Sequence, residues 1–554
     1  MTTHEVSNQP PPLEGIDLFE TDRGLATGIL REAPGAPTDE LTALGKLAGQ
    51  AETLALGFDA NAYPPELRTH DRFGNRLDEV VYHPSYHRLM EHATAFGLHA
   101  APWRNPSAHA HLLRAAKFYI WSQVEAGHGC PISMTYASVA ALRAEPRLAR
   151  LWEPMLAAAC YDQRSLPAAE KFGVLCGMAM TEKQGGSDVR ANTTRATFVE
   201  SGAEGDLYRL VGHKWFCSAP MSDAFLTLAQ TDEGLTCFLM PRILPDGSRN
   251  GIQLQRLKDK LGNRSNASSE MEFDGSLAWR VGAPGRGVPT IAEMINHTRL
   301  DCLIGSSALM RWALAQALHH TRYRSAFGKP LIEQPLMRNV LADLTLESEA
   351  ATALFLRLAN AVDRSAGGDP HATALKRLGT AVGKYYVCKR APVAIGEALE
   401  CLGGNGYVEE SGLPRLYREA PVNSVWEGSG TVNALDVLRI LRKQPQIVDA
   451  WQSEMAPAAA DPRIAKAVAA LERELRGDPE QLEGRARAVV ERLALLWQAA
   501  LLMRTSAPLA DAFIASRIAG EWGYTLGTLP RGSDLDAILE RGMPAAHAGL
   551  TATV

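Results

Sequence analysis

Three consecutive helical runs constrain the fold of this chain more than any other feature of its sequence. Apolar residues recur every three or four positions over residues 291–325, 335–365 and 372–402, and each run is about 30 residues long. Helices of this length, separated by short connections, bury their apolar faces when they lie side by side. The pattern therefore predicts a helical bundle over residues 289–443.

The residues before the bundle change character. Residues 38–169 repeat apolar side chains with helical spacing, which predicts an N-terminal helical domain over residues 1–170. Residues 171–288 instead show alternation, punctuated by glycine and proline, which predicts a middle β domain. We expect its strands at 194–200, 207–214, 223–230, 235–241 and 270–274.

The residues after the bundle, 444–554, return to helical spacing but are interrupted by several prolines. They predict an additional helical domain at the C-terminal end. The predicted fold class is therefore mainly α with a central β domain (α+β).

Charge and cysteine content exclude several classes of protein. The chain has 62 acidic and 57 basic side chains and a formal net charge of -5, so it does not coat nucleic acid by overall charge. The eight cysteines contain no CxxC pair and no close cluster with histidine, which argues against a metal site or a disulfide framework. The N-terminus has no signal-like pattern, and the longest apolar stretch, 493–503, is too short to span a bilayer. We expect a cytoplasmic protein with no bound metal and no membrane partner.

One loop at the start of the β domain carries the clearest chemical signal. It combines two hydroxyl side chains, Thr181 and Ser187, with the glycine pair that ends at Gly186. Glycine lets a backbone approach a planar or phosphorylated ligand closely, so that its N–H groups can bind the ligand. The loop has neither the GxGxxG nor the Walker spacing, so on composition alone a polar inter-domain loop stays open as the alternative.

Five motifs, in order along the chain, resemble those of the acyl-CoA dehydrogenase family. They are MTEKQGGSDV from Met180, HKWFCS from His213, RSAFGKP from Arg324, LGGNGY from Leu402 and VWEGSGT from Val425. The first motif, together with CPISMTYA from Cys130 and LGNRSNAS from Leu261, resembles the AidB branch of the alkylation response. The resemblance covers about residues 10–550. It implies an N-terminal helical domain, a β-barrel-like middle domain, a four-helix bundle and an extra C-terminal helical domain.

The resemblance implies one FAD per subunit, held by residues from all five motifs. In this family, Arg324 and the loop at Gly403 would reach the FAD of a neighbouring subunit, which implies a homo-oligomer, specifically a homotetramer. A guanidinium such as that of Arg324 suits a pyrophosphate because it offers several donors in one plane. The implied cofactor residues are Met180, Thr181, Gly186, Ser187, Trp215, Phe216, Cys217, Ser218, Arg324, Phe327, Gly403, Gly404, Trp426, Gly428, Ser429 and Thr431.

The resemblance also implies a catalytic base, Glu427, that removes the α-proton of an acyl-CoA while the β-hydride passes to the flavin. Burial beside a flavin and a thioester raises the pKa of such a carboxyl group toward a useful range. Some relatives place the base in the helix at Thr298, which is not an acid here, so Glu427 stands alone. Arg299 matches a family position near the CoA moiety. The alternative for Glu427 is an acid that merely favours a helix N-terminus.

Two further implications concern activity and partners. The glutamine of the family's Glu-Gly-Thr-x-Gln is Thr431 here, a change shared with the AidB branch, which implies weak activity on ordinary acyl-CoA. That branch is also linked to double-stranded DNA, and Arg439 falls on its DNA-linked arginine. Residues 441–554 have 13 basic against 14 acidic side chains, so a solvated helix face is the alternative to a DNA surface. We keep three hypotheses: an FAD enzyme of this type, a flavin-containing DNA-binding protein with vestigial catalysis, and a helical scaffold without cofactor.

Overall fold

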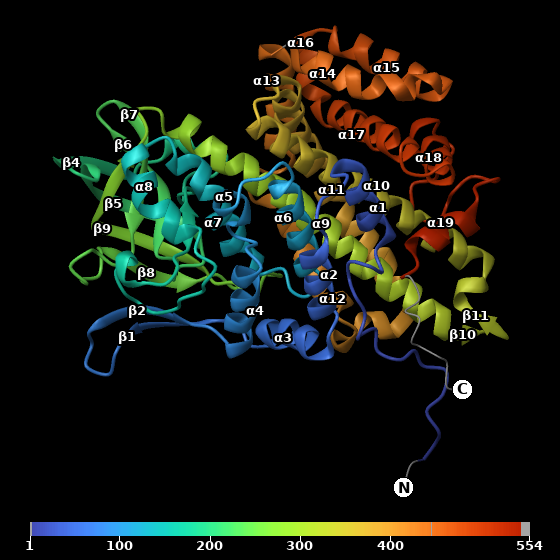
Figure 1. Cartoon of the computed structure of the whole chain (residues 1–554), viewed down its shortest axis with the longest axis horizontal. Helices are drawn as coiled ribbons and strands as arrows, with labels where there is room; N and C mark the ends of the chain where they lie inside the picture. Colours follow the sequence, from blue (N-terminus) through green and yellow to red (C-terminus); the bar gives the residue numbers. More distant parts are fainter. Residues whose placement is uncertain (1–2, 445, 545–554) are drawn as a thin grey trace. The chain divides into compact units, whose positions relative to one another are not determined.

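The computed structural model describes residues 3–444 and 446–544, and these fall into two compact units (Figure 1). The bundle unit comprises Met1–Leu54, His111–Val124 and Cys302–Val554. The sheet unit comprises Ala55–Ala110 and Glu125–Asp301. The division into four domains at residues 170, 288 and 443 is a different partition and stays a prediction.

The sheet unit is built around a seven-stranded sheet. Its strands are β3 (Cys176–Ala179), β4 (Arg195–Gly202), β5 (Gly205–Ser218), β6 (Ala224–Thr231), β7 (Gly234–Pro241), β8 (Ile252–Leu257) and β9 (Ser268–Val281). The order is β3-β6-β4-β5-β9-β7, with β8 beside β9, and the additional pairing of β6 with β7 closes the strands into a barrel-like ring. This confirms the middle β domain and its five expected strands, to which the structure adds β3 and β8.

The first part of the chain is helical, with one exception. Its helices are α1 (Arg23–Glu32), α2 (Asp39–Ala48), α3 (Ala51–Ala62), α4 (Pro84–Ala95), α5 (Ala101–Arg104), α6 (Ala110–Ser122), α7 (Gly129–Leu142) and α8 (Pro146–Leu156). Between α3 and α4, the strands β1 (Glu66–His70) and β2 (Arg76–Val81) form an antiparallel hairpin. The expectation of helix throughout residues 38–169 was therefore wrong here. The reason is local, because Asp71 accepts hydrogen bonds from the backbone of Phe73 and Asn75 and so closes a turn.

The bundle unit contains the three long helices that the sequence predicts. They are α9 (Gly287–Tyr323), which begins in the sheet unit, α10 (Pro335–Ala366) and α11 (Pro370–Cys401). A proline begins α10 and α11, and Asp369 caps α11 by accepting from the Ala372 amide at 3.1 Å. The shorter α12 (Leu413–Val425) and α13 (Gly430–Lys443) pack against α11, which confirms the expected bundle.

Residues 446–544 fold onto the bundle. They form α14 (Gln446–Met455), α15 (Pro462–Leu475), α16 (Pro479–Gly484), α17 (Ala486–Met503), α18 (Ala507–Phe513), a π-helical turn (Ile514–Ile518) and α19 (Leu535–Gly542). Helix α17 packs on α10, α11 and α13, and α19 packs on α10 (Figure 1). Arg517, in the π-helical turn, is fully buried and forms ion pairs with Asp343 and Glu347 of α10. Across the described residues, no helix is long and apolar enough to cross a membrane.

Candidate functional site

The loop that follows β3 presents two uncommitted hydroxyl groups. The Thr181 and Ser187 side chains are at least partly exposed, and neither hydroxyl makes a hydrogen bond within the described part of the chain. Gly186 lies against Thr181, since a Cβ built on Gly186 would be 3.1 Å from the Thr181 methyl group. The loop thus has hydrogen-bonding groups to offer a ligand and a glycine where the packing is closest.

A buried ion pair holds this loop in place. Lys214 of β5 donates to Glu182 at 2.8 Å, and both side chains are 0% exposed. The Glu182 carboxylate also accepts from the backbone amides of Thr193 (2.7 Å) and Thr194 (3.2 Å). Burial alone would raise the pKa of Glu182, but the Lys214 charge and these hydrogen bonds lower it to about 2. Glu182 is therefore an anion that fixes its neighbour Thr181.

The same ion pair fixes Trp215, one of the predicted cofactor residues. Trp215 directly follows Lys214, and its backbone N–H donates to the Thr181 carbonyl at 2.8 Å. The Lys258 ammonium group lies over the Trp215 ring, 3.2 Å from the ring centroid. The structure thus brings the two predicted sites Thr181 and Trp215 together.

The next three predicted residues on β5 differ in orientation. Phe216 is exposed, whereas Cys217 is fully buried, and burial raises the pKa of the Cys217 thiol to about 12. The Ser218 hydroxyl is 3.2 Å from that of Ser268. A contact between Cys217 and a cofactor would therefore have to use its backbone, since its side chain belongs to the core of the sheet unit.

The segment that bears Glu427 connects α12 to α13 in the bundle unit. Glu427 is half-buried and has φ of +57°, and Gly428 follows with φ of +94°. A non-glycine residue in this left-handed region is strained unless its surroundings hold it there. Lys384 of α11 donates to the Trp426 carbonyl at 2.7 Å and to the Gly428 carbonyl. The predicted residues Ser429 and Thr431 lie at the start of α13, where Ser429 occupies the N-cap position.

The predicted cross-subunit residues lie on the surface of the bundle unit. Arg324, just after α9, donates to the Asn8 carbonyl at 2.7 Å. Phe327 lies in the turn between β10 (Ser325–Ala326) and β11 (Lys329–Pro330), with φ of +53° and a side chain that is 98% exposed. Gly403 and Gly404, in a 3₁₀ turn after α11, have no atom within 4 Å of an added Cβ. These positions leave room for a partner molecule.

The remaining predicted residues lie on two helices. Arg299 is buried on the part of α9 that belongs to the sheet unit, beside Thr298, whose hydroxyl donates to the Ile295 carbonyl at 3.1 Å. Arg439 of α13 pairs with Asp436, and its side chain is 57% exposed.

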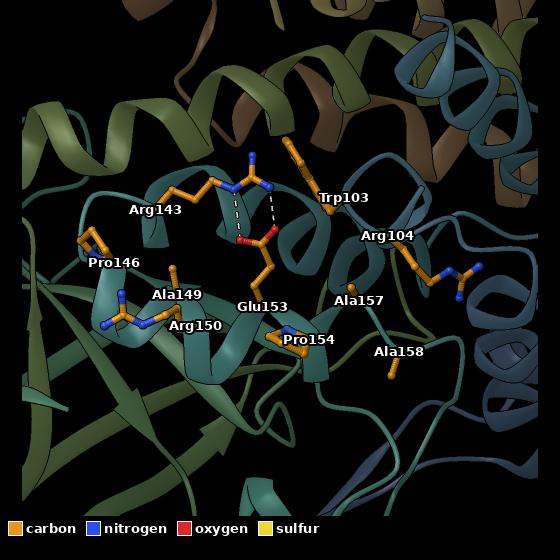
Figure 2. A pocket seen from close by; sticks show the side chains of 10 residues that line it. All are labelled: Trp103, Arg104, Arg143, Pro146, Ala149, Arg150, Glu153, Pro154, Ala157 and Ala158. Atoms are coloured by element: carbon orange, nitrogen blue, oxygen red, sulfur yellow. Dashed lines mark hydrogen bonds and ion pairs between the residues drawn. The ribbon is translucent and has the colours of Figure 1, made fainter. Parts of the chain in front are cut away.

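The sheet unit also contains a cavity of about 740 Å³, lined by residues of the segments 103–104 and 143–158 (Figure 2). Arg143 and Glu153 point toward each other there and share two hydrogen bonds, of 3.1 and 2.5 Å. The Arg143 guanidinium is also 4.9 Å from the Trp103 ring centroid. Arg104 and Arg150 point away from this pair. The cavity lining includes no residue that we predicted to hold a cofactor.

Sequence reasoning missed the supporting residues Glu182, Lys214 and Lys384. A usable signal existed for Lys384, since it is a single charge within the run Ala381–Val387, where apolar and aromatic residues predominate. No such signal marks Glu182, because it lies in a polar loop. Among the described residues, no group of three or more metal-ligating side chains is suited to hold a metal ion.

Comparisons with known proteins agree over most of the chain. Residues 8–163 match the adaptive response protein AidB N-terminal domain, 177–276 the acyl-CoA dehydrogenase middle domain and 285–441 the acyl-CoA dehydrogenase C-terminal domain. AidB of Escherichia coli (strain K12) is 47% identical over 92% of this chain and 94% of its own length. Acyl-CoA dehydrogenase family member 11 of Caenorhabditis elegans is 33% identical over 72% of this chain and 66% of its own length.

Solved structures show the same fold. The apo form of Bd2924 superposes with a TM-score of 0.82 at 29% identity, covering 92% of this chain and all of that one. ACDH-11 of Caenorhabditis elegans, solved with C11-CoA, has a TM-score of 0.81 at 26% identity, covering 98% of this chain and 93% of that one. Together with the ordered domain matches, these likenesses show that the chain belongs to the acyl-CoA dehydrogenase family, in its AidB branch.

Proposed function

We propose that this protein is an FAD-dependent acyl-CoA dehydrogenase-type oxidoreductase in which Glu427 is the catalytic base. The observation that carries the proposal is the Glu427 carboxylate, half-buried and presented from a left-handed residue between two helices. Strain of this kind persists where the surroundings over-determine the conformation, and it concentrates at functional sites. Membership of the family supports the reaction type.

The residues of the sheet unit fit the proposed cofactor. The uncommitted hydroxyl groups of Thr181 and Ser187 are donors of the kind that the polar edge of a flavin requires, and Gly186 lets that loop approach closely. Trp215 supplies an aromatic surface that is tied to Thr181 through the backbone. When bound, FAD supplies the acceptor for a hydride; the protein supplies binding, orientation and the base.

The proposed substrate is an acyl thioester of CoA. A carboxylate base must reach the α-carbon, whose proton is acidified by the adjacent thioester carbonyl, and Glu427 takes that proton onto its carboxylate. One relative of known structure, ACDH-11, was solved with C11-CoA, which supports a CoA thioester for this chain as well. Because Thr431 replaces the usual glutamine, we propose that turnover of ordinary acyl-CoA is weak.

Glu427→Gln tests the proposed base. The variant is similar in size and keeps a hydrogen-bonding side chain, so FAD content is expected to stay at the wild-type level. Anaerobic addition of a panel of acyl-CoA thioesters bleaches the flavin absorbance of the wild-type protein, and this bleaching is expected to slow at least about 1000-fold in the variant. Equal bleaching rates in the two proteins would refute the assignment.

We further propose a homotetramer that completes each FAD site with Arg324, Gly403 and Gly404 from a neighbouring subunit. The exposed Phe327 and the open space over both glycines support an interface there. Arg324→Ala is expected to have two effects at once. It lowers FAD retention, and it reduces the mass of the assembly measured by light scattering. A fully loaded variant of unchanged mass would contradict the cross-subunit role. A cytoplasmic location is part of the proposal, since the spacing of the eight cysteines in the sequence is not typical of a disulfide framework.

Binding of double-stranded DNA, with vestigial catalysis, is the second candidate. The 57% exposure of the Arg439 side chain favours it, although this arginine is itself paired with Asp436. The neighbouring arginines favour it less, because Arg485 and Arg492 both pair with Glu474, which lowers the charge that they offer to phosphates. The test is duplex DNA retention at rising salt, with Arg439→Glu as the variant. Retention that is insensitive to both salt and the substitution would eliminate this candidate.

A further inference from the structure

Lys384 of α11 is a buried cation that lies beside the proposed catalytic base. Its side chain is 1% exposed, and its ammonium group donates to the Trp426 carbonyl at 2.7 Å and to the Gly428 carbonyl. These carbonyl groups belong to the two residues that flank Glu427 in the sequence. The lysine therefore bridges the backbone across Glu427 and Gly428, the first of which carries the carboxylate.

The placement of this lysine is energetically unusual. Within the described parts of the chain, Lys384 forms no ion pair, and its hydrogen bonds go to backbone carbonyls. A buried ammonium without a carboxylate partner is costly, and carbonyl dipoles recover only part of its lost hydration. Core packing alone would be served better by methionine or leucine at this position.

The backbone that Lys384 holds is strained at two successive residues. Glu427 has φ of +57° and Gly428 has φ of +94°, and the carbonyls of Trp426 and Gly428 both turn toward Lys384 of α11. Asn433 supports the far side of the segment, where it donates to the Gly428 carbonyl at 2.6 Å and to the Ser429 carbonyl at 3.0 Å. Without the lysine, the Trp426 carbonyl would lose the hydrogen bond that fixes the start of this turn.

We propose that Lys384 is a positioning residue that locks Glu427 in its left-handed conformation and thereby aims the carboxylate. The proposal rests on the proposed role of Glu427 as the base. Lys384 touches neither substrate nor cofactor in this assignment and acts through the backbone. Its removal is expected to release the 425–430 segment while the rest of the bundle stays folded.

The test compares Lys384→Met with Lys389→Met in the full-length, FAD-loaded protein. Methionine keeps the length and apolar stem of lysine but loses the donor. Lys389 is a matched control on the same helix, since its ammonium group lies near Gly430 and over the Tyr385 ring at 5.8 Å. In Lys384→Met, kcat with an acyl-CoA is expected to fall about 100-fold, because a misplacement of about 1 Å costs that much, while KM and FAD content stay within about threefold.

A second readout does not depend on turnover. Hydrogen–deuterium exchange of peptides covering residues 424–432 is expected to be at least about 10-fold faster in Lys384→Met and unchanged in Lys389→Met. If Lys384→Met does not fold, Lys384→Gln, which keeps an N–H donor on a shorter stem, is measured in the same way, with faster exchange expected. Wild-type exchange together with wild-type kcat in the folded variant would overturn the proposal.

The outcomes separate this proposal from the assignment of the base. Full activity of Glu427→Gln refutes the base whatever Lys384 does. Inactive Glu427→Gln with fully active Lys384→Met leaves the base standing and refutes the positioning role. A fall in kcat with unaltered KM, combined with faster exchange confined to 424–432, supports both.

Discussion

Removing Lys214 is the perturbation whose effect follows most directly from the structure. In Lys214→Met, the Glu182 carboxylate stays buried in the sheet unit but loses its 2.8 Å charged partner. Breaking a fully buried ion pair from one side costs about 3–5 kcal/mol of unfolding free energy, because an uncompensated charge is left behind. The direction of the Glu182 pKa agrees with this, because the Lys214 charge and the hydrogen bonds from Thr193 and Thr194 hold it at about 2 against the effect of burial.

Hydrogen exchange measures this loss where it occurs. A loss of 3 kcal/mol is expected to accelerate exchange of the slowest amides in β3 and β5 by about 100-fold, since each 1.4 kcal/mol is worth a factor of ten. Lys183→Met is the matched control, because Lys183 directly follows Glu182 in the same loop and its side chain is exposed. It is expected to stay within about 0.5 kcal/mol of the wild type.

A double substitution decides whether the ion pair is the cause. Glu182→Gln combined with Lys214→Met removes both charges and is expected to be more stable than Lys214→Met alone. The reasoning is refuted if Lys214→Met costs less than about 1 kcal/mol, or if the double variant is less stable than the single one.

Two more predictions concern the bundle unit. Burial raises the pKa of Asp363 to about 7 despite two backbone N–H groups that donate to it, so the folded state holds a proton that the unfolded state releases. The contribution of Asp363 to stability is therefore fully present below its ordinary pKa of 3.8 and is lost, by roughly 4 kcal/mol, as pH rises through about 7; the difference between urea titrations of the wild type and of Asp363→Asn across this range should show it. Gly406→Ala is expected to cost about 1–3 kcal/mol, because the new Cβ would be 2.1 Å from the Leu399 carbonyl oxygen. Gly484→Ala, which meets no atom within 4 Å, is the control, and equal melting temperatures for the two variants would show that the contact relaxes freely.

The long elements could be predicted from the sequence because their periodicity extends over many residues. Helices α9, α10 and α11 begin and end within a few residues of the expected runs, and the five expected strands are all present. The short elements could not be predicted. The strand β3 has only four residues and pairs in parallel with β6, far along the chain, so no local alternation marks it. The hairpin β1–β2 depends on a turn centred on Asp71, within a stretch that is otherwise helical.

The candidate site likewise contains residues that could be predicted from the sequence and residues that could not. Residues with distinctive local neighbours, such as Thr181 and Glu427, could be named from motifs. Residues that hold them could not, because Lys214 and Lys384 act on backbone segments more than 30 residues away in the sequence. Burial of Cys217 also depends on register, which shifts between Lys214 and Cys217 on β5. Such relations exist only once the chain has folded.

The docking of residues 446–544 restricts how this protein can be shortened. Asp343 and Glu347 on α10 obtain a counter-charge from Arg517, and Glu349 obtains one from Arg541. Deleting the extension would remove the counter-charges of Asp343 and Glu349 and leave Glu347 with Arg390 of α11, in addition to uncovering the apolar surface beneath α17. A truncated chain would therefore have a destabilised bundle. Its properties would not show whether the extension itself is dispensable. For the same reason, an ancestor that gained or lost these residues would have needed compensating changes on α10 at the same time.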